Sequence, residues 1–217
     1  MIDVPTIRHQ MVEQQVRAWS VLDLRVLEVM DRVAREQFVP PAFRDIAYAD
    51  MCVPLGHGQS MLAPKVEGRI LQSLAIQPQD RVLEIGTGSG YFAACLAQLA
   101  RSVRSIELVQ ELADTARANL ERNGVRSVAV EVGDAMTLEE EAAYDVIAVT
   151  GSLPLYDPRF ERALTMGGRL FVTVGAGPVM DARKIVRVGT TESTVESLFE
   201  TRIEPLVNAP RPPAFVF

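Results

Sequence analysis

The sequence predicts an α/β fold with a doubly wound, mostly parallel sheet, and three observations support this. Between residues 81 and 175, short apolar runs typical of strands alternate with segments of helical periodicity. Such alternation predicts βαβ units, and hence a parallel sheet covered on both faces. One strand–helix junction, at 84–90, carries three glycines in the order Gly-x-Gly-x-Gly. A chain of 217 residues that is 48% apolar suits one such domain with short additions.

Helices and an irregular segment are expected ahead of the sheet. Residues 6–19 place apolar side chains at helical spacing. A second helix is expected over 23–32, with Asp23 as its N-cap. The segment 39–64 is rich in turn-forming residues and long for a loop, which indicates a functional segment or a cover over a site. Helical periodicity returns over 65–76 and leads into the sheet.

The alternating region supplies most of the sheet. Strands are expected over 81–86, 102–108, 127–134, 143–151 and 167–175, with helices over 91–100 and 109–124. Gly124 is expected at the C′ position of the second of these helices. After residue 180 two segments, 184–191 and 194–207, are typical of an antiparallel hairpin.

These elements predict one domain over 1–217. It is expected to consist of an N-terminal helical and loop segment, a ligand-binding core, and C-terminal strands with a tail, at 1–77, 78–180 and 181–217 respectively. The last residues, PRPPAFVF, are apolar enough to dock on the domain or on a partner.

Composition excludes several classes of protein. The net charge of -6 argues against a nucleic-acid partner, which usually meets a basic surface. No apolar run is long enough to span a bilayer, and the N-terminus lacks the pattern of a signal peptide. The two cysteines and two histidines, Cys52, Cys95, His9 and His57, have no metal-site spacing. We therefore expect a cytoplasmic protein without a membrane segment, a structural metal or a nucleic-acid partner.

An acidic residue stands just before the glycine loop. Glu84 lies inside an expected strand, where parallel sheets are normally apolar on both faces. A buried carboxylate needs a partner, and a pyrophosphate would repel it, whereas a cationic ligand would suit it. The dinucleotide fingerprint would also need a glycine at Tyr91. The loop therefore favours S-adenosylmethionine, which carries a sulfonium and an ammonium, over NAD.

Two further acids follow the next two strands. Glu107 lies 23 residues beyond Glu84, close to the offset of roughly 20 residues expected of an acid that binds a ribose. Asp134 ends the following strand and can accept a hydrogen bond from an adenine amino group. Each acid alone could be a solvated strand end, but acids at three successive strand ends favour one ligand site. Thr150, after the fourth strand, faces the same site by topology.

Taken together, these segments resemble a class I methyltransferase and, more specifically, the protein-L-isoaspartate O-methyltransferases. The resemblance covers about 11–175. It is carried by MVEQQVRAWSVLDLRVLEVM, REQFVPPAFRDIAYAD, PLGHGQSMLAP, RVLEIGTGSGYFAACLA, VGDA and VTGSLP. The N-terminal matches are the most family-specific, because the glycine loop is shared by all class I methyltransferases.

The resemblance implies methyl transfer from S-adenosylmethionine to the α-carboxylate of L-isoaspartyl residues in damaged proteins, with S-adenosylhomocysteine as the product. The ester then cyclises to a succinimide, which reopens partly to aspartate. The acceptor carboxylate is ionised at neutral pH, since its reference pKa is about 4. No general base is therefore expected, and alignment of oxygen, methyl and sulfur supplies the catalysis. The implied partners are damaged proteins or peptides, and the sequence predicts no oligomeric state.

The implied substrate loop departs from the family pattern Gly-x-Gly-Gln-Thr-Ile-Ser-x-Pro. Here it is GHGQSMLAP, with Ser60 in place of the threonine and Met61 in place of the isoleucine. Leu62 stands where the family serine is expected to bind the substrate carboxylate, and leucine cannot donate that hydrogen bond. Ser60 and Leu62 are therefore the candidate residues on the substrate side. Glu67 takes the place of a family histidine.

The candidate cofactor-binding residues come from the start of the helix after the substrate loop, the glycine loop and the ends of the later strands. They are Ala63, Pro64, Lys65, Glu84, Gly86, Thr87, Gly88, Ser89, Gly90, Glu107, Leu108, Gly133, Asp134, Ala135 and Thr150. The first three are included because the resemblance implies that their segment approaches the methionine part of the cofactor.

Two alternatives stand beside the repair-enzyme hypothesis. A methyltransferase of this family could act on another carboxylate or on a small molecule, and the apolar Leu62 favours that possibility. A protein that binds S-adenosylmethionine but has lost turnover is the second. Amino methyltransferases of nucleic acids usually carry an Asn/Asp-Pro-Pro-aromatic motif after the fourth strand, where this chain has VTGSLP.

Overall fold

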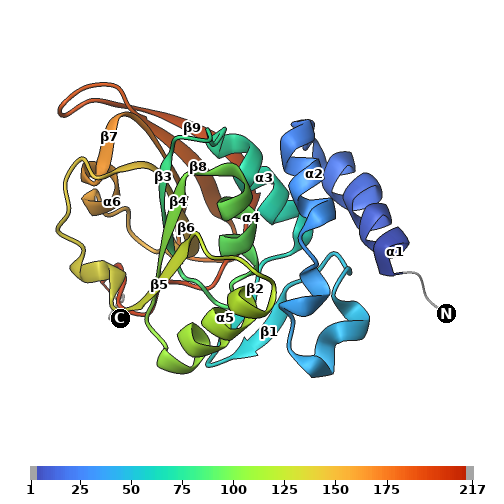
Figure 1. The fold of residues 1–217 in the computed structure, drawn as a ribbon. Coiled ribbons are helices and arrows are strands. Elements are labelled where there is room, and N and C mark those ends of the chain that lie inside the picture. The colour runs from blue at the N-terminus through green and yellow to red at the C-terminus, as the bar shows by residue number, and fades with distance from the viewer. Residues whose placement is uncertain (1–3, 214–217) are drawn as a thin grey trace.

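A seven-stranded sheet forms the centre of the structure (Figure 1). The computed structural model describes residues 4–213. The strands are β3 (Arg81–Ile85), β4 (Ser102–Glu107), β5 (Val128–Val132), β6 (Tyr144–Leu153), β7 (Leu164–Val174), β8 (Met180–Arg187) and β9 (Ser193–Thr201). Their order is β5-β4-β3-β6-β7-β8-β9. The first five in this order are parallel, and β8 and β9 add antiparallel strands at one edge. The predicted fold class is confirmed.

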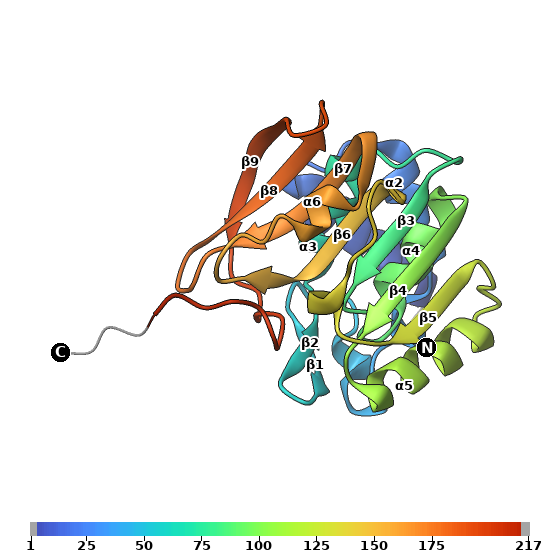
Figure 2. The same cartoon turned by 90° about the vertical axis from the view of Figure 1, so that its left-hand side faces the viewer.

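Helices cover the sheet, mainly on the side of the N-terminal segment (Figures 1 and 2). They are α1 (Val4–Met11), α2 (Leu24–Arg32), α3 (Pro64–Leu74), α4 (Tyr91–Leu99), α5 (Gln110–Arg122) and α6 (Arg159–Arg162). Short turns of helix are η1 (Val12–Val16), η2 (Arg17–Trp19), η3 (Arg35–Gln37), η4 (Pro41–Ile46) and η5 (Ala135–Thr137). The division of the chain at residues 77 and 180 stays a prediction.

Two hydrophobic clusters lie on opposite faces of the sheet because side chains alternate along each strand. Val82 packs with the layer formed by α1–α4, whereas Leu83 and Ile85 pack with the layer that contains Phe160 of α6. The same alternation applies to β6, where Val146 and Ile147 belong to different clusters. Both faces of the central strands β3 and β6 are therefore buried, as predicted, whereas the parallel edge strand β5 leaves Ala129, Glu131 and Val132 exposed.

The predicted helix ends are confirmed at two positions. Asp23 accepts a hydrogen bond from the backbone N–H of Arg25 at 2.9 Å and caps α2. Gly124 follows α5 with a φ of 69°, which a residue with a Cβ adopts at a cost. Its N–H donates to Glu121 O, and the next N–H, of Val125, donates to Leu120 O. This pair of backbone hydrogen bonds is a Schellman motif.

The first helix and the long loop differ from prediction. The helix expected over 6–19 changes at residue 12 from α-helix to a π-helical turn, η1, and then to η2. Met11 and Val12, on either side of this change, are both buried. Within 39–64 the structure contains η4 and a hairpin of β1 (Val53–Gly56) and β2 (Gln59–Met61), which were not predicted. Strands this short show no clear alternation in the sequence.

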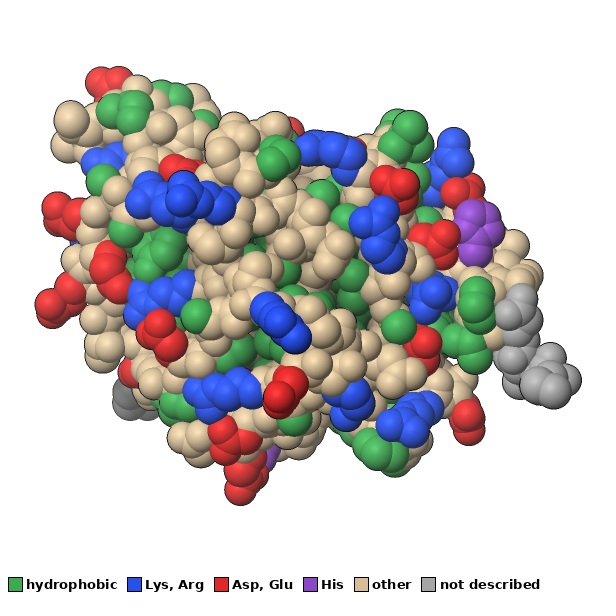
Figure 3. Space-filling view, viewed as in Figure 1, with side chains coloured by type: hydrophobic (Ala, Val, Ile, Leu, Met, Phe, Trp, Pro, Cys, Tyr) green, Lys and Arg blue, Asp and Glu red, His purple; other side chains and the backbone are tan. Residues whose placement is uncertain are grey.

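The described part of the chain shows no feature typical of a membrane span or a metal site. Within residues 4–213, no helix has the length and apolar character needed to cross a bilayer. The same residues contain no cluster of histidine, cysteine, aspartate and glutamate that could hold a metal ion. On the face drawn in Figure 3, basic and acidic side chains are interspersed rather than gathered into one basic patch.

Close packing of α3 against the N-terminal segment generates a testable prediction. A Cβ atom on Gly68 would lie 2.6 Å from Val16 Cγ1 and 3.2 Å from Met30 Sδ. Gly68→Ala should therefore lower the melting temperature, because overpacking costs about 1–3 kcal/mol, against a gain in helix propensity of roughly 1 kcal/mol.

Thermal denaturation measures this effect. Ser73→Ala, in the same helix but only partly buried, is the control and should change stability little. The loss should shrink when Gly68→Ala is combined with Val16→Ala, which removes the clashing methyl groups. A Gly68→Ala variant that melts higher than the wild type would contradict the packing described here.

Candidate functional site

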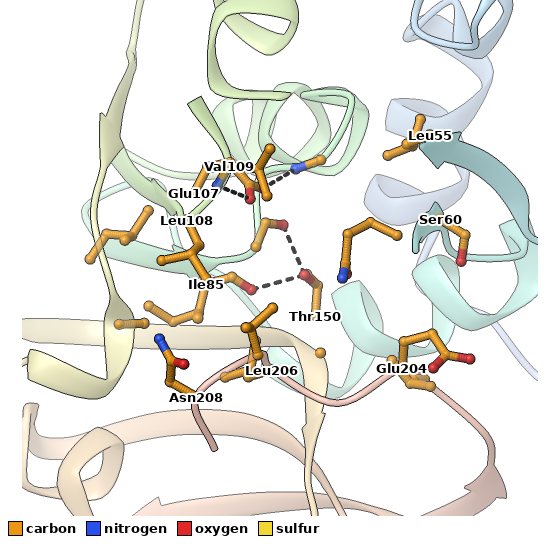
Figure 4. Close-up of a pocket in the computed structure, with 18 of the residues that line it drawn as sticks. Leu55, Ser60, Ile85, Glu107, Leu108, Val109, Thr150, Glu204, Leu206 and Asn208 are labelled. Carbon is orange, nitrogen blue, oxygen red and sulfur yellow. Dashed lines mark hydrogen bonds between the residues drawn. The ribbon is translucent and has the colours of Figure 1, made fainter. Parts of the chain in front are cut away.

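A cavity of about 230 Å³ opens at the carboxyl ends of β3, β4 and β6 (Figure 4). In a doubly wound sheet this edge, beside the point where the strand order reverses, is where ligands bind. Ten of the residues predicted for the site line it. They are Ser60, Leu62, Gly86, Gly88, Glu107, Leu108, Gly133, Asp134, Ala135 and Thr150.

Thr150 fixes the start of the glycine loop, as the dashed lines in Figure 4 show. Its hydroxyl lies 2.8 Å from both Ile85 O and Gly86 O and donates to them. Gly86 has a φ of 93°, and a Cβ there would lie 2.5 Å from Thr150 Oγ1. Only glycine fits this position, so the tight turn and the threonine depend on each other.

Glu107, at the end of β4, is held by two backbone amides. Its Oε2 accepts from the N–H of Gly88 at 2.9 Å, and its Oε1 accepts from the N–H of Val109 at 3.0 Å. The side chain is buried, yet it lines the cavity. Each carboxylate oxygen can accept a further hydrogen bond. Glu107 therefore presents two acceptors in a fixed orientation.

Asp134 is more engaged than the sequence suggests. Its Oδ1 accepts from the N–H of Met136 at 2.8 Å and caps η5, while its Oδ2 accepts from the Asn208 amide at 2.8 Å. The side chain lines the cavity on the same side as Asn208. Each oxygen keeps one acceptor position, so a ligand amino group would share this carboxylate with protein donors.

Glu84 lies behind the glycine loop and not at the rim of the cavity. Its neighbour two residues earlier, Val82, points into the helical layer, and Glu84 points the same way. Ser105 Oγ donates to Glu84 Oε2, and Thr87 Oγ1 lies 2.5 Å from Ser105 Oγ. Glu84 Oε1 is buried without a hydrogen-bond partner among the described residues. Burial raises the pKa of Glu84 to about 8, and the charges of Glu107 and Glu67 add to the effect.

A smaller cavity of about 40 Å³ adjoins the main one at the glycine loop and shares lining residues with it. Two predicted residues, Thr87 and Ser89, line this inner cavity but not the main one. Glu67 also lines it, although only 2% of its surface is exposed. Its Oε2 binds Arg35, which is fully buried and donates to Ala47 O and Leu62 O as well. This buried network was not predicted, because its members are distant in the sequence.

Four other predicted residues line neither cavity. Ala63 and Pro64 begin α3 and are buried. Lys65 turns away, since its Nζ binds Asp50 at 2.6 Å and lies over the Trp19 ring. Gly90 begins α4, and a Cβ there would approach Ala116 of α5 at 3.3 Å, so its role is in helix packing. Direct cofactor contact by these residues stays a prediction.

A C-terminal segment, 202–208, forms one wall of the cavity and was missed (Figure 4). Ser152 holds it, because the Ser152 N–H donates to Glu204 O, the Leu206 N–H donates to Ser152 O, and Ser152 Oγ donates to Ile203 O. The strand predicted over 194–207 is too long, because β9 ends at Thr201, and the sequence gave no indication of where the following segment docks. Of the predicted tail, residues 210–213 are exposed and 214–217 lie outside the described residues.

The wall residues add the polar groups that sequence reasoning lacked. Arg202 is exposed and is the one lysine or arginine that lines the main cavity in the described part of the chain. Against it stand three acids, Glu107, Asp134 and Glu204. The cavity therefore favours a ligand that carries positive charge.

Comparison with known proteins places these features in a family. The family model for protein-L-isoaspartate(D-aspartate) O-methyltransferase (PCMT) matches residues 7–210. Protein-L-isoaspartate O-methyltransferase 2 of Marinobacter nauticus is 41% identical over 94% of both chains. The Methanoculleus marisnigri protein-L-isoaspartate O-methyltransferase is 42% identical over 88% of this chain and 86% of its own.

A solved structure shares the fold. It comes from Plasmodium falciparum, is described as a protein-L-isoaspartate O-methyltransferase, and contains S-adenosyl-L-homocysteine. The TM-score is 0.81 at 20% identity, and the match covers 92% of this chain and 97% of that one.

The environment of Glu84 predicts a pH dependence of stability. Its pKa of about 8 in the folded protein exceeds the ordinary value of 4.5, so the folded chain keeps this proton longer than the unfolded chain does. The free energy of unfolding should therefore fall as the pH rises from about 4.5 to about 8. Glu84→Gln cannot ionise, and its melting temperature should fall less over that range.

Melting curves of ligand-free protein between pH 5 and pH 8 check this. Glu121→Gln, on the exposed side of α5, is the matched control and should follow the wild type. Parallel curves for the wild type and Glu84→Gln would show that Glu84 is ionised throughout.

Proposed function

The chain belongs to the protein-L-isoaspartate(D-aspartate) O-methyltransferase family, and we propose that it transfers the methyl group of S-adenosylmethionine to the free carboxylate of L-isoaspartyl residues in damaged proteins. The observation that carries this proposal is the anchored carboxylate of Glu107 beside the glycine loop. The relatives are protein-L-isoaspartate O-methyltransferases by name, which supports this acceptor.

The residues present fit S-adenosylmethionine better than a dinucleotide. The Gly88 N–H, which a phosphate-binding loop would turn toward its ligand, is bonded to Glu107. The remaining acceptor positions of Glu107 suit the two hydroxyls of a ribose. Ile85, Ile106 and Met136 supply apolar surface for a purine. The surplus of acids around the cavity suits the sulfonium and the ammonium of this ligand.

The chain's part in the reaction is positioning and exclusion of water. When bound, S-adenosylmethionine supplies an electrophilic methyl group. The acceptor carboxylate is already ionised at neutral pH, so no side chain has to remove a proton. The described residues that line the cavity include no histidine. Leu55, Leu62 and Leu206 exclude water from the site, and alignment of the reacting atoms can contribute roughly 7–11 kcal/mol.

The acceptor carboxylate needs hydrogen-bond donors, and Leu62 provides none from its side chain. Ser60 is half-buried and lines both cavities. Arg202 lines the main cavity and forms no hydrogen bond or ion pair with the rest of the described chain. We assign these two residues to the acceptor side of the site. An acceptor other than an isoaspartyl residue is the second candidate, because Leu62 makes this side more apolar than the family pattern implies.

Replacement of Glu107 tests the cofactor half of the proposal. Glu107→Ala removes two charge-assisted hydrogen bonds to the ribose, worth roughly 1.5–3 kcal/mol each. Affinity for S-adenosylhomocysteine, measured by calorimetry, should fall at least tenfold. Glu131→Ala, an exposed acid on the neighbouring strand, serves as the control and should bind normally. An unchanged dissociation constant for Glu107→Ala would remove this residue from the site.

Replacement of Leu62 tests the acceptor half. Wild-type protein should methylate an isoaspartyl peptide weakly but above its aspartyl twin, in a radiolabel transfer assay. Leu62→Ser should raise this activity by about ten- to a hundredfold, because it restores a hydrogen bond to a charged group worth roughly 1.5–3 kcal/mol. Ser60→Ala should lower it.

Leu62→Ala is the matched control for that experiment, since it makes the same space without a hydroxyl. A gain in Leu62→Ser alone would assign the effect to the hydrogen bond. No isoaspartyl activity in the wild type, together with no gain in Leu62→Ser, would exclude the repair reaction and leave the cofactor assignment in place.

A further inference from the structure

Glu67 is a buried acid that borders the site. It lies in the first turns of α3, three residues after Pro64, and 2% of its surface is exposed. It nevertheless lines the inner cavity, whose other lining residues include Ser60, Leu62 and Thr150. These three also line the main cavity, so the two cavities are adjacent. Glu67 therefore lies one cavity wall away from the site in which the ligand is expected.

Only one half of the Glu67 carboxylate is engaged. Its Oε2 binds the Arg35 guanidinium, and its Oε1 has no hydrogen-bond partner among residues 4–213. Arg35 is held independently by Ala47 O at 2.9 Å and Leu62 O at 2.7 Å, and its guanidinium stacks over the Tyr91 ring. The pair is thus fixed in place with one acceptor oxygen left for a ligand.

The charges around the glycine loop do not balance. Three buried carboxylates, Glu67, Glu84 and Glu107, lie around the loop, and the charges of Glu107 and Glu67 add to the burial that raises the pKa of Glu84 to about 8. Arg35 is the one buried arginine or lysine in the described chain. Buried like charges are unfavourable unless cations join them. The inner cavity therefore has the electrostatics of a binding site for a cation.

The orientation of the ligand places a cation there. Under the proposed function, Glu107 and Asp134 hold the nucleoside. Figure 4 shows Ser60 and Leu55 on the opposite side of the cavity from Leu108 and Asn208. The amino-acid half of the ligand would then extend toward Ser60, beside the inner cavity. We propose that the free oxygen of Glu67 binds the α-ammonium of that half and that Arg35 positions the carboxylate, an inference that rests on the proposed function.

Two ligands that differ in the amino-acid half test this assignment. S-adenosylhomocysteine carries the α-ammonium, whereas 5′-methylthioadenosine keeps the nucleoside and the sulfur and lacks it. In Glu67→Gln, the affinity for S-adenosylhomocysteine measured by calorimetry should fall by about ten- to a hundredfold. The affinity for 5′-methylthioadenosine should not change. Glu84→Gln, a buried acid that lines neither cavity, should alter both affinities by the same factor.

The outcomes separate the two proposals. If Glu67→Gln lowers the affinity for both ligands equally, Glu67 only supports the loop and the assignment is overturned. Unchanged affinities for both ligands would overturn it as well. If Glu67→Gln does not fold, the wild type is titrated with S-adenosylhomocysteine and with its analogue lacking only the α-amino group, and equal affinities would overturn it. Wild-type protein that binds neither nucleoside would instead refute the proposed function.

Discussion

The carboxylate of Glu107 joins the three strand ends on which the site depends. Its side chain accepts from Gly88 in the loop after β3 and from Val109 at the start of the α5 turn, and its backbone oxygen accepts from Gly133 after β5. Glu107 thus links the ends of β3, β4 and β5, because it accepts hydrogen bonds from backbone amides that follow each of these strands. Because backbone groups fix it, the carboxylate reaches the cavity without freedom to turn away, and the ligand finds its acceptors already oriented.

The same arrangement explains why the interior beneath the loop is acidic. The glycines of the loop present only backbone atoms to a ligand. Charged groups that complement the ligand therefore have to come from the flanking strands and from α3. A parallel sheet buries both faces, and any acid placed there loses its water. Ser105 donates a hydrogen bond to Glu84 and is itself hydrogen-bonded to Thr87. Arg35 forms an ion pair with Glu67. The residual negative charge is unfavourable in the empty protein and becomes favourable when a cation binds.

Features that depend on a local sequence pattern could be predicted, whereas features that depend on contacts between distant segments could not. The sheet, the Asp23 cap and the Gly124 helix end follow from periodicity and from single residues with special conformations. Placement of Glu107 follows from its position at a strand end. Glu84 lies behind the loop because side chains alternate along a strand. Its position could have been predicted, since Glu84 is two residues after the apolar Val82 and therefore points to the same face of the sheet. The 202–208 wall and the Arg35–Glu67 pair could not be predicted, since each joins segments far apart in the chain.

The two halves of the site are built on different parts of the structure. The groups assigned to the cofactor lie on strand ends that are hydrogen-bonded into the sheet, and a change there would disturb several strands at once. The groups assigned to the acceptor lie on the β1–β2 hairpin and its continuation, which contains Leu62, and on the segment held by Ser152. These elements lie outside the seven-stranded sheet. The acceptor side can therefore change, as Leu62 shows, while the cofactor side keeps its geometry.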